Sequence, residues 1–104
     1  MIIATTENIP ERNVKEILGV VRGNTIQSRD VGRDIMAGLK TIVGGEIKSY
    51  TEMISRAREE AISRMTAEAE KLGADAILMV RFTTSSVMPQ AAEVLAYGTA
   101  VKFE

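Results

Sequence analysis

The sequence predicts an α+β domain with an antiparallel sheet and two helices on one of its faces, in the order β–β–α–α–β–β. Three observations carry this prediction. Residues 49–72 repeat apolar side chains at helical spacing, residues 93–103 alternate as a strand does, and residues 76–80 are apolar throughout. Strands at both ends of the chain with helices between them favour an antiparallel sheet that is covered on one side.

The first quarter of the chain predicts two strands joined by an irregular link. Residues 2–5 form a short β-rich run, and residues 16–27 form a longer one. Pro10 lies in the link between them. Gly23 and Asn24 interrupt the longer run, either as a bulge or as a bend.

A first helix is predicted from Ser28 or Asp30 to about Val43, because either residue can cap a helix N-terminus. Its apolar stripe consists of Val31, Ile35, Leu39 and Ile42. Gly44 and Gly45 follow, and one of them can take the left-handed position that ends a helix.

The second helix has the strongest pattern. Ser49 and Glu52 have the spacing of a capping box, and Gly73 is placed to end the helix. Glu60 and Arg64 form a favourable i,i+4 pair on its polar face. The predicted buried seam is Tyr50, Met53, Ile54, Ala57, Ala61, Met65, Ala69 and Leu72.

Two further strands are predicted after the second helix. Residues 74–84 form the first, residues 85–91 a turn or loop, and residues 93–103 the second. One face of the last strand carries Leu95, Tyr97, Thr99, Val101 and Phe103. Because residues 76–80 are apolar on both faces and one helical layer covers only one, we expect a neighbouring subunit to cover the other.

Composition indicates a single domain spanning residues 1–104 and excludes several classes of partner. Thirteen basic residues face fourteen acidic ones, so the net charge of −1 gives no electrostatic case for nucleic acid. The longest apolar run is far too short to cross a bilayer, and the N-terminus lacks a signal-peptide pattern. The absence of cysteine agrees with a cytoplasmic protein.

Glycine-marked motifs recur in a defined order along the chain. They are Gly19-Val20-Val21, Arg33-Asp34 with Ala37-Gly38, Ile42-Val43-Gly44-Gly45, Tyr50, Ala57-Arg58-Glu59 with Ala61, Leu72-Gly73-Ala74-Asp75-Ala76 and Gly98-Thr99-Ala100-Val101. In order and spacing they resemble the YbjQ-like family of small proteins that carry a heavy-metal-binding label. The resemblance implies a dodecin-like subunit in a cyclic homo-oligomer, a pentamer. The chain departs from the family pattern at Met79, where a glycine is expected, and at Arg81.

The chain contains no Cys and no His, which are the ligands that soft metals prefer. Methionine is the only sulfur ligand left, and Met53 and Met65 lie on the apolar seam, where core packing explains them. No EF-hand-like spacing of carboxylates appears. We therefore predict no metal ligands and no cofactor.

The candidate ligand or interface residues are Arg33, Asp34, Gly44, Gly45, Tyr50, Arg58 and Asp75. The two glycines either expose amides to a phosphate or carboxylate, or only end a helix. Asp34 and Arg58 are placed to pair across the two helices or between subunits. For Asp75, at a helix-to-strand turn, capping is a sufficient explanation.

The residue types favour a function other than catalysis. No Ser-His-Asp or Cys-His set can form, and acid–base chemistry would fall to residues such as Asp34, Asp75, Glu46 or Tyr50, each with a shifted pKa in a pocket. The leading expectation is a ring-forming cytoplasmic protein that binds a small ligand or partner at subunit boundaries. The alternatives are a metal-ion-binding protein and a small carboxylate-dependent enzyme.

Overall fold

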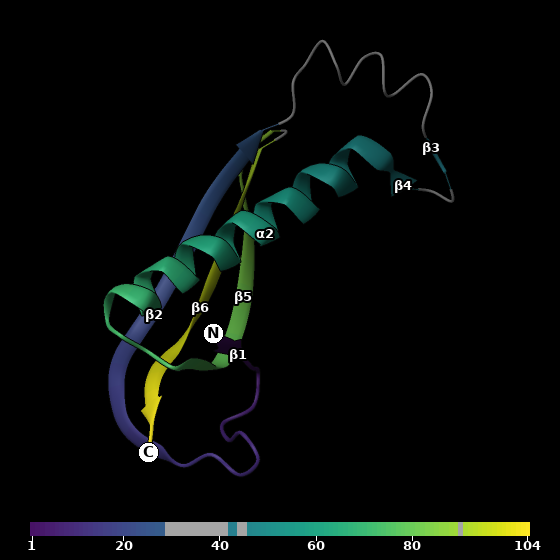
Figure 1. The fold of residues 1–104 in the computed structure, drawn as a ribbon. Helices are drawn as coiled ribbons and strands as arrows, with labels where there is room; N and C mark the ends of the chain where they lie inside the picture. The colour runs from purple at the N-terminus through teal and green to yellow at the C-terminus, as the bar shows by residue number, and fades with distance from the viewer. Residues whose placement is uncertain (29–41, 44–45, 90) are drawn as a thin grey trace.

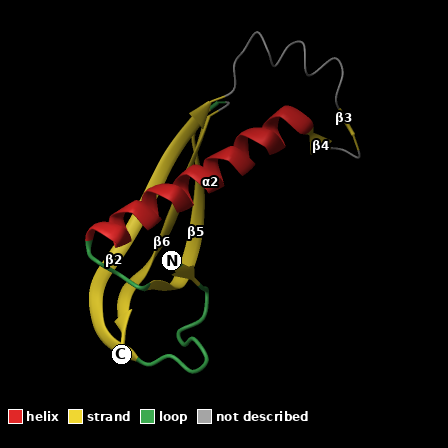
Figure 2. Cartoon of the chain, viewed as in Figure 1, coloured by secondary structure: helices red, strands yellow, loops and turns green. Residues whose placement is uncertain are grey.

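The computed structural model describes residues 1–28, 42–43, 46–89 and 91–104. Its elements are β1 (Ile2–Ile3), β2 (Val14–Ser28), β3 (Ile42–Val43), β4 (Glu46–Ile47), α2 (Lys48–Lys71), β5 (Ala76–Met88) and β6 (Ala91–Phe103) (Figures 1 and 2). Most of the first predicted helix, residues 29–41, lies outside the described residues. Its predicted end does not, and it is wrong, because Ile42–Val43 forms strand β3.

The α+β class fits, but the predicted order with two helices is wrong. The described residues contain one helix, a four-stranded sheet in the order β1-β5-β6-β2, and a small β3-β4 ribbon. The main sheet is mixed rather than antiparallel, because Ile2 and Ile3 of β1 pair in parallel with Ala76 and Ile77. Alternation within a strand carries no information about the direction of its partner, and the partner of β1 is more than 70 residues away in the sequence, so the sequence could not predict this pairing.

Strand β2 is continuous through Gly23, so the predicted interruption there is wrong. The irregular positions lie earlier, between Val14 and Glu16 and between Ile17 and Gly19. Gly23 lies directly beneath α2, where an added Cβ would collide with the backbone of Ala61 and Met65. The glycine therefore allows a close helix–sheet contact.

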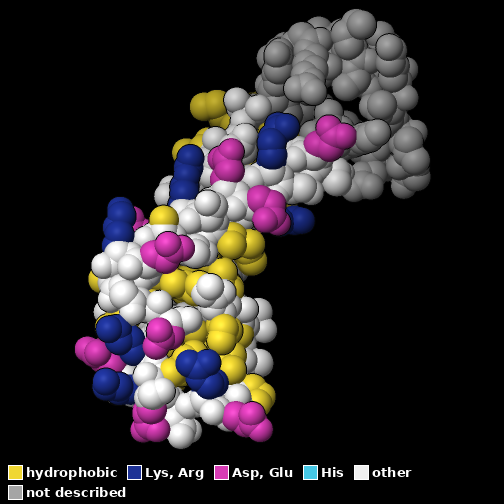
Figure 3. Space-filling view, viewed as in Figure 1, with side chains coloured by type: hydrophobic (Ala, Val, Ile, Leu, Met, Phe, Trp, Pro, Cys, Tyr) yellow, Lys and Arg dark blue, Asp and Glu magenta, His cyan; other side chains and the backbone are white. Residues whose placement is uncertain are grey.

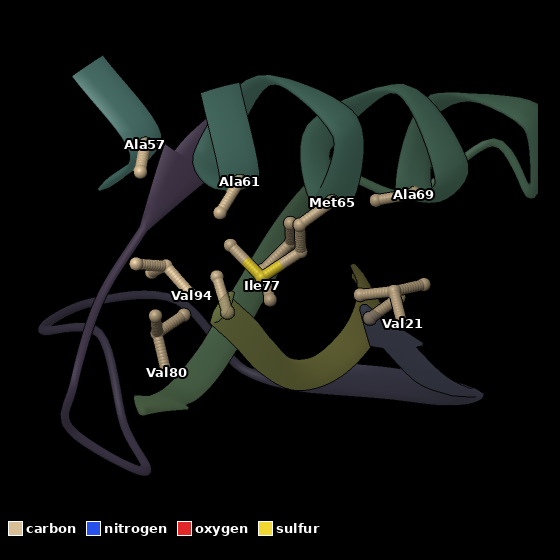
Figure 4. Packing of buried hydrophobic residues seen from close by; sticks show 10 residues of the cluster. Val21, Ala57, Ala61, Met65, Ala69, Ile77, Val80 and Val94 are labelled. Atoms are coloured by element: carbon tan, nitrogen blue, oxygen red, sulfur yellow. The ribbon is translucent and has the colours of Figure 1, made fainter. Parts of the chain in front are cut away.

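Helix α2 buries most of the seam that its periodicity predicts. Tyr50 and Ile54 are only half-buried, and Leu72, which follows the last helical residue, is 46% exposed. The helix ends before Gly73, whose φ of 75° agrees with the predicted stop. The main core consists of Val21, Ala57, Ala61, Met65, Ala69, Ile77, Val80, Val94, Ala96 and Ala100 (Figure 4).

A cluster of polar side chains also joins α2 to β2 through hydrogen bonds. The hydroxyl of Thr25, a buried residue, donates a hydrogen bond to Glu60 Oε2 at 3.1 Å, and Gln27 Nε2 donates to the same oxygen at 2.9 Å. Arg64 lies 3.8 Å from Glu60 and donates to the carbonyl of Asn24 at 2.6 Å. The predicted Glu60–Arg64 pair is thus confirmed, and it also bridges the helix and the sheet.

Strand β5 is longer than predicted, and the predicted loop over residues 85–91 is wrong. Ser85 pairs with Glu93 and Ser86 with Ala92, which leaves only residues 89 and 90 between β5 and β6. The serines and threonines of this segment are typical of a loop, which is why the sequence predicts a loop there. A solvent-exposed strand can also carry polar side chains, because it buries neither face.

The sheet face opposite α2 is partly covered by the chain's own N-terminal segment. Ala4 and Ile9 pack against a second cluster formed by Ala76, Leu78, Val101 and Phe103. The Arg12 guanidinium lies 4.3 Å from the centroid of the Phe103 ring. The apolar run after the helix is therefore covered within one chain, contrary to the expected need for a neighbouring subunit at this point.

Met79 has a backbone conformation that explains the glycine expected at this position. Its φ is 56°, in the left-handed region, at the irregular step between Leu78 and Arg81 in β5. This backbone conformation costs residues that have a Cβ roughly 1–2 kcal/mol, whereas glycine adopts it without strain.

We predict that Met79→Gly changes the free energy of unfolding by less than about 1 kcal/mol, because relief of backbone strain offsets the loss of the contacts of a side chain that is 43% exposed. Met79→Val should destabilise by about 1–2 kcal/mol, since β-branched residues tolerate positive φ poorly. Urea denaturation of the two variants measures both effects. Equal stability of the valine and glycine variants would contradict the assigned conformation.

Candidate functional site

Four of the seven predicted site residues, Arg33, Asp34, Gly44 and Gly45, lie outside the described residues. The proposed pairing of Asp34 with Arg58 and the two readings of the glycine pair therefore stay predictions.

Tyr50 and Arg58 lie on the same side of α2, two turns apart. With Thr51 and Ile54 they line a pocket of about 250 Å³ near the start of the helix. Tyr50 and Ile54 are half-buried, and Arg58 is exposed. The pocket combines an apolar wall with a cation and a phenol, which suits a small polar ligand or a contact with another chain.

Asp75 lies at the turn between α2 and β5 and is hydrogen-bonded to the end of β6. Its Oδ2 accepts a hydrogen bond from the Phe103 amide at 2.9 Å, and its own amide donates to the Val101 carbonyl at 2.9 Å. These bonds join the first residues of β5 to the last residues of β6. The Asp75 side chain therefore stabilises the pairing of β5 with β6.

A larger groove lies where the sequence predicts no site. It has a volume of about 870 Å³ and runs between the outer edge of β2 and the C-terminal end of α2. It is lined by Val20, Val21, Arg22 and Asn24 from the strand and by Glu68, Lys71 and Leu72 from the helix and its end. The exposed positions of Leu72 and of Val20, which is 74% exposed, make its walls partly apolar.

The charges in the groove leave an excess of positive charge. Lys71 Nζ lies 3.4 Å from Glu68 Oε1, so these two charges compensate each other. Arg22 has no ion-pair partner among the residues that the structure describes. Alternation in β2 places Val20 and Arg22 on the sheet face opposite α2, because Val21 and Gly23 face the helix, so these two residues line the groove from the strand edge. The sequence did not predict the groove because it predicted that Leu72 is buried.

The residues present do not fit a soft-metal centre. The chain has no cysteine or histidine, and over the described ranges no three acidic side chains gather where they could hold an ion. Met53 and Met65 are fully buried in the helix–sheet core, and the more exposed Met79 lies on β5. No sulfur cluster of the kind that copper(I) requires is seen among these three residues.

In the described part of the chain, no helix is both long enough and apolar enough to cross a membrane. The cytoplasmic location expected from the sequence stays a prediction.

Together, these observations define a small α+β sheet protein with a groove along the β2 edge of its sheet. A family profile described as "Putative heavy-metal-binding" matches residues 1–104. The chain therefore belongs to the YbjQ-like family, as its motifs indicate.

Relatives in distant organisms are similar over nearly their whole length. A UPF0145 protein of Archaeoglobus fulgidus is 65% identical, with 98% of this chain and 94% of the relative covered. A UPF0145 protein of Thermotoga maritima is 61% identical, with 100% and 98% covered. A solved structure from Pediococcus pentosaceus, a DUF74-family protein of unknown function, has a TM-score of 0.72 at 20% identity, with 100% of this chain and 98% of that chain covered. This last likeness supports the fold alone.

We predict that the purified protein holds well under one zinc or copper ion per chain, because thiolate and imidazole ligands are missing. Elemental analysis after dialysis against metal-free buffer provides the measurement. One equivalent of zinc retained at submicromolar affinity would contradict the prediction.

Proposed function

We propose that this protein forms a homo-oligomeric ring and binds a small ligand at the boundary between subunits, without catalysing a reaction. One observation carries the proposal. The groove of about 870 Å³ lies along the outer edge of β2, which pairs with no other strand in the described part of the chain. A neighbour that adds a strand to this edge forms the missing wall of the groove.

Exposed apolar side chains on β2 support an assembly. Ile17, Val20 and Ile26 are 70%, 74% and 61% exposed, all on an edge strand of 15 residues. A long apolar edge strand is an aggregation hazard unless another chain or element covers it. A closed ring covers every such edge in the same way and leaves no open contact surface. The family resemblance supplies the number of five.

The groove is suited to a small anion with an apolar part. Arg22 lines the groove from the strand edge and has no ion-pair partner among the described residues, so its guanidinium is available to bind carboxylate, sulfonate or phosphate oxygens through two parallel hydrogen bonds. Val20 and Leu72 supply apolar surface within the same groove. This combination of a cation with exposed apolar walls is the chemistry on which the ligand assignment depends.

The contacts of the carboxylates support a binding role rather than an enzymatic one. Glu60 accepts hydrogen bonds that fasten the helix to the sheet, and Asp75 accepts one that joins two strands. A carboxylate-dependent enzyme needs titratable groups that face a substrate site together. Neither of these two residues lines the groove, and the carboxylate that does, Glu68, is ion-paired with Lys71. Metal handling, the alternative that the family description suggests, is tested separately by the elemental analysis.

We predict a particle of about 56 kDa, five chains of 11.3 kDa each, at micromolar concentration. Light scattering coupled to size exclusion measures this mass. A monodisperse particle of one chain would contradict the proposed assembly. A trimer or tetramer would contradict only the number.

The ligand assignment is tested with anilinonaphthalene sulfonate, an aromatic sulfonate that fluoresces when bound. Arg22→Gln should weaken its binding about tenfold, equal to roughly 1.4 kcal/mol. Lys15→Gln removes a charge from the same strand outside the groove and serves as the matched control. Equal affinity in both variants would exclude Arg22 as the anion-binding residue.

A further inference from the structure

Among the described residues, the main sheet has two edges that pair with no other strand. One is the outer edge of β2, and the other is the outer edge of β5 over Arg81–Met88. Earlier in β5 this second edge is occupied, because the amides of Met79 and Val80 donate to the carbonyls of Thr6 and Ala4. From residue 81 onward, no described strand pairs with it. Within the described residues, each chain therefore has two strand edges whose outward backbone groups form no ladder with another strand.

The two edges have matching directions. Strands β2 and β5 are both antiparallel to β6, so they run parallel to each other. A rotation about an axis near the strand direction preserves strand direction, and it brings β5 of one copy beside β2 of the next as a parallel pair. The same junction repeats around the ring until no edge remains.

The apolar side chains also match across such a junction. Phe82 pairs with Ala96, whose neighbour on β2 is Gly23, so Phe82 lies on the sheet face that α2 covers. The helix packs mainly on β2 and β6, and Phe82 is 45% exposed. Hydrophobic side chains are visible on the molecular surface beside the helix (Figure 3). At the opposite edge of the sheet, the end of α2 and the edge of β2 enclose the groove around Val20–Asn24.

The levels along the strands agree as well. Phe82, Ala96 and Gly23 stand in one row across the sheet, and the groove lies at this same level of β2. Because a rotation includes no translation along its axis, a row of residues in one copy lies at nearly the same height along the axis as the equivalent row in the next copy. Only the tilt of the strands shifts the two rows relative to each other.

We infer that the Arg81–Met88 edge of β5 pairs in parallel with β2 of the next copy, and that Phe82 forms the second wall of that copy's groove. The inference rests on the proposed ring and names its contact surface. It also explains why β5 is exposed from Arg81 onward: the helix end of the neighbouring copy lies above the position that Phe82 occupies.

The area of this contact is sufficient for a stable assembly. Eight residues of strand span about 26 Å. The sheet and its helix layer are together about 20 Å thick, which gives about 500 Å² on each partner and about 1,000 Å² per junction. This reaches the lower limit for specific interfaces, and every chain in a ring makes two such junctions. A two-fold contact between β2 edges would leave both β5 edges open.

The chain has no cysteine, so single cysteines can test the junction. Asn24→Cys is made on β2, and Thr83→Cys and Ser85→Cys are made separately on β5. The β2 variant is refolded together with each β5 variant and treated with a thiol cross-linker of about 8 Å. In the proposed ring, equivalent positions of neighbouring copies are three strand spacings apart, about 14 Å, so this cross-linker cannot join two copies of the same variant. We expect covalent dimers in at least one mixture and none in any variant alone.

The outcomes separate this inference from the proposed function. Cross-linking of Asn24→Cys alone would indicate a two-fold β2 contact and would overturn the inference. A ring-sized particle in light scattering with no cross-linking in either mixture would also overturn it, while the ring itself stands. A single-chain particle would overturn the proposed assembly.

Phe82 is tested by a matched pair of substitutions at one position. Phe82→Asp should raise the concentration at which the ring dissociates at least tenfold, equal to about 1.4 kcal/mol, because it places a charge against apolar walls. Phe82→Leu keeps an apolar side chain and should retain the ring. Circular dichroism confirms that each chain is folded. A folded Phe82→Asp variant with unchanged dissociation would show that Phe82 lies outside the junction.

Discussion

The close contact of α2 with β2 at Gly23 is the constraint on which the rest of the structure depends. The helix backbone at Ala61 and Met65 occupies the space that any side chain at residue 23 would need. The alanines at 57, 61 and 69 are fully buried and keep the helix face flat over the sheet. Small residues on both sides thus bring two backbones together, and the dispersion contacts of the core follow from that approach.

This contact determines what remains exposed. Because the helix is held over β2, it covers β2 and β6 and makes few contacts with β5 (Figure 1). The N-terminal segment covers only the part of the opposite face near Val101 and Phe103. The open edges, the groove beside β2 and the exposed Phe82 are consequences of this arrangement. The proposed binding site and the inferred junction both lie at sheet edges that pair with no other described strand.

Sequence patterns predicted the elements with strong periodicity and missed those that depend on distant partners. The seam of α2, its end at Gly73 and the alternation of β6 are local, so they could be predicted. The role of Gly23 could not, since a glycine in a strand resembles an interruption until the helix above it is known. The groove was missed because Leu72 continues the helical spacing past the end of the helix, where tertiary contacts no longer bury it.

The central contact is tested most directly by the stability of Gly23→Ala, measured by urea denaturation beside Ser85→Ala on the exposed strand β5. The account predicts that the added methyl group forces α2 away from β2 and lowers the free energy of unfolding by at least about 2 kcal/mol. Ser85→Ala should change it by less than about 0.5 kcal/mol. A Gly23→Ala protein as stable as this control would contradict the account, because α2 would then not rest on the backbone of β2.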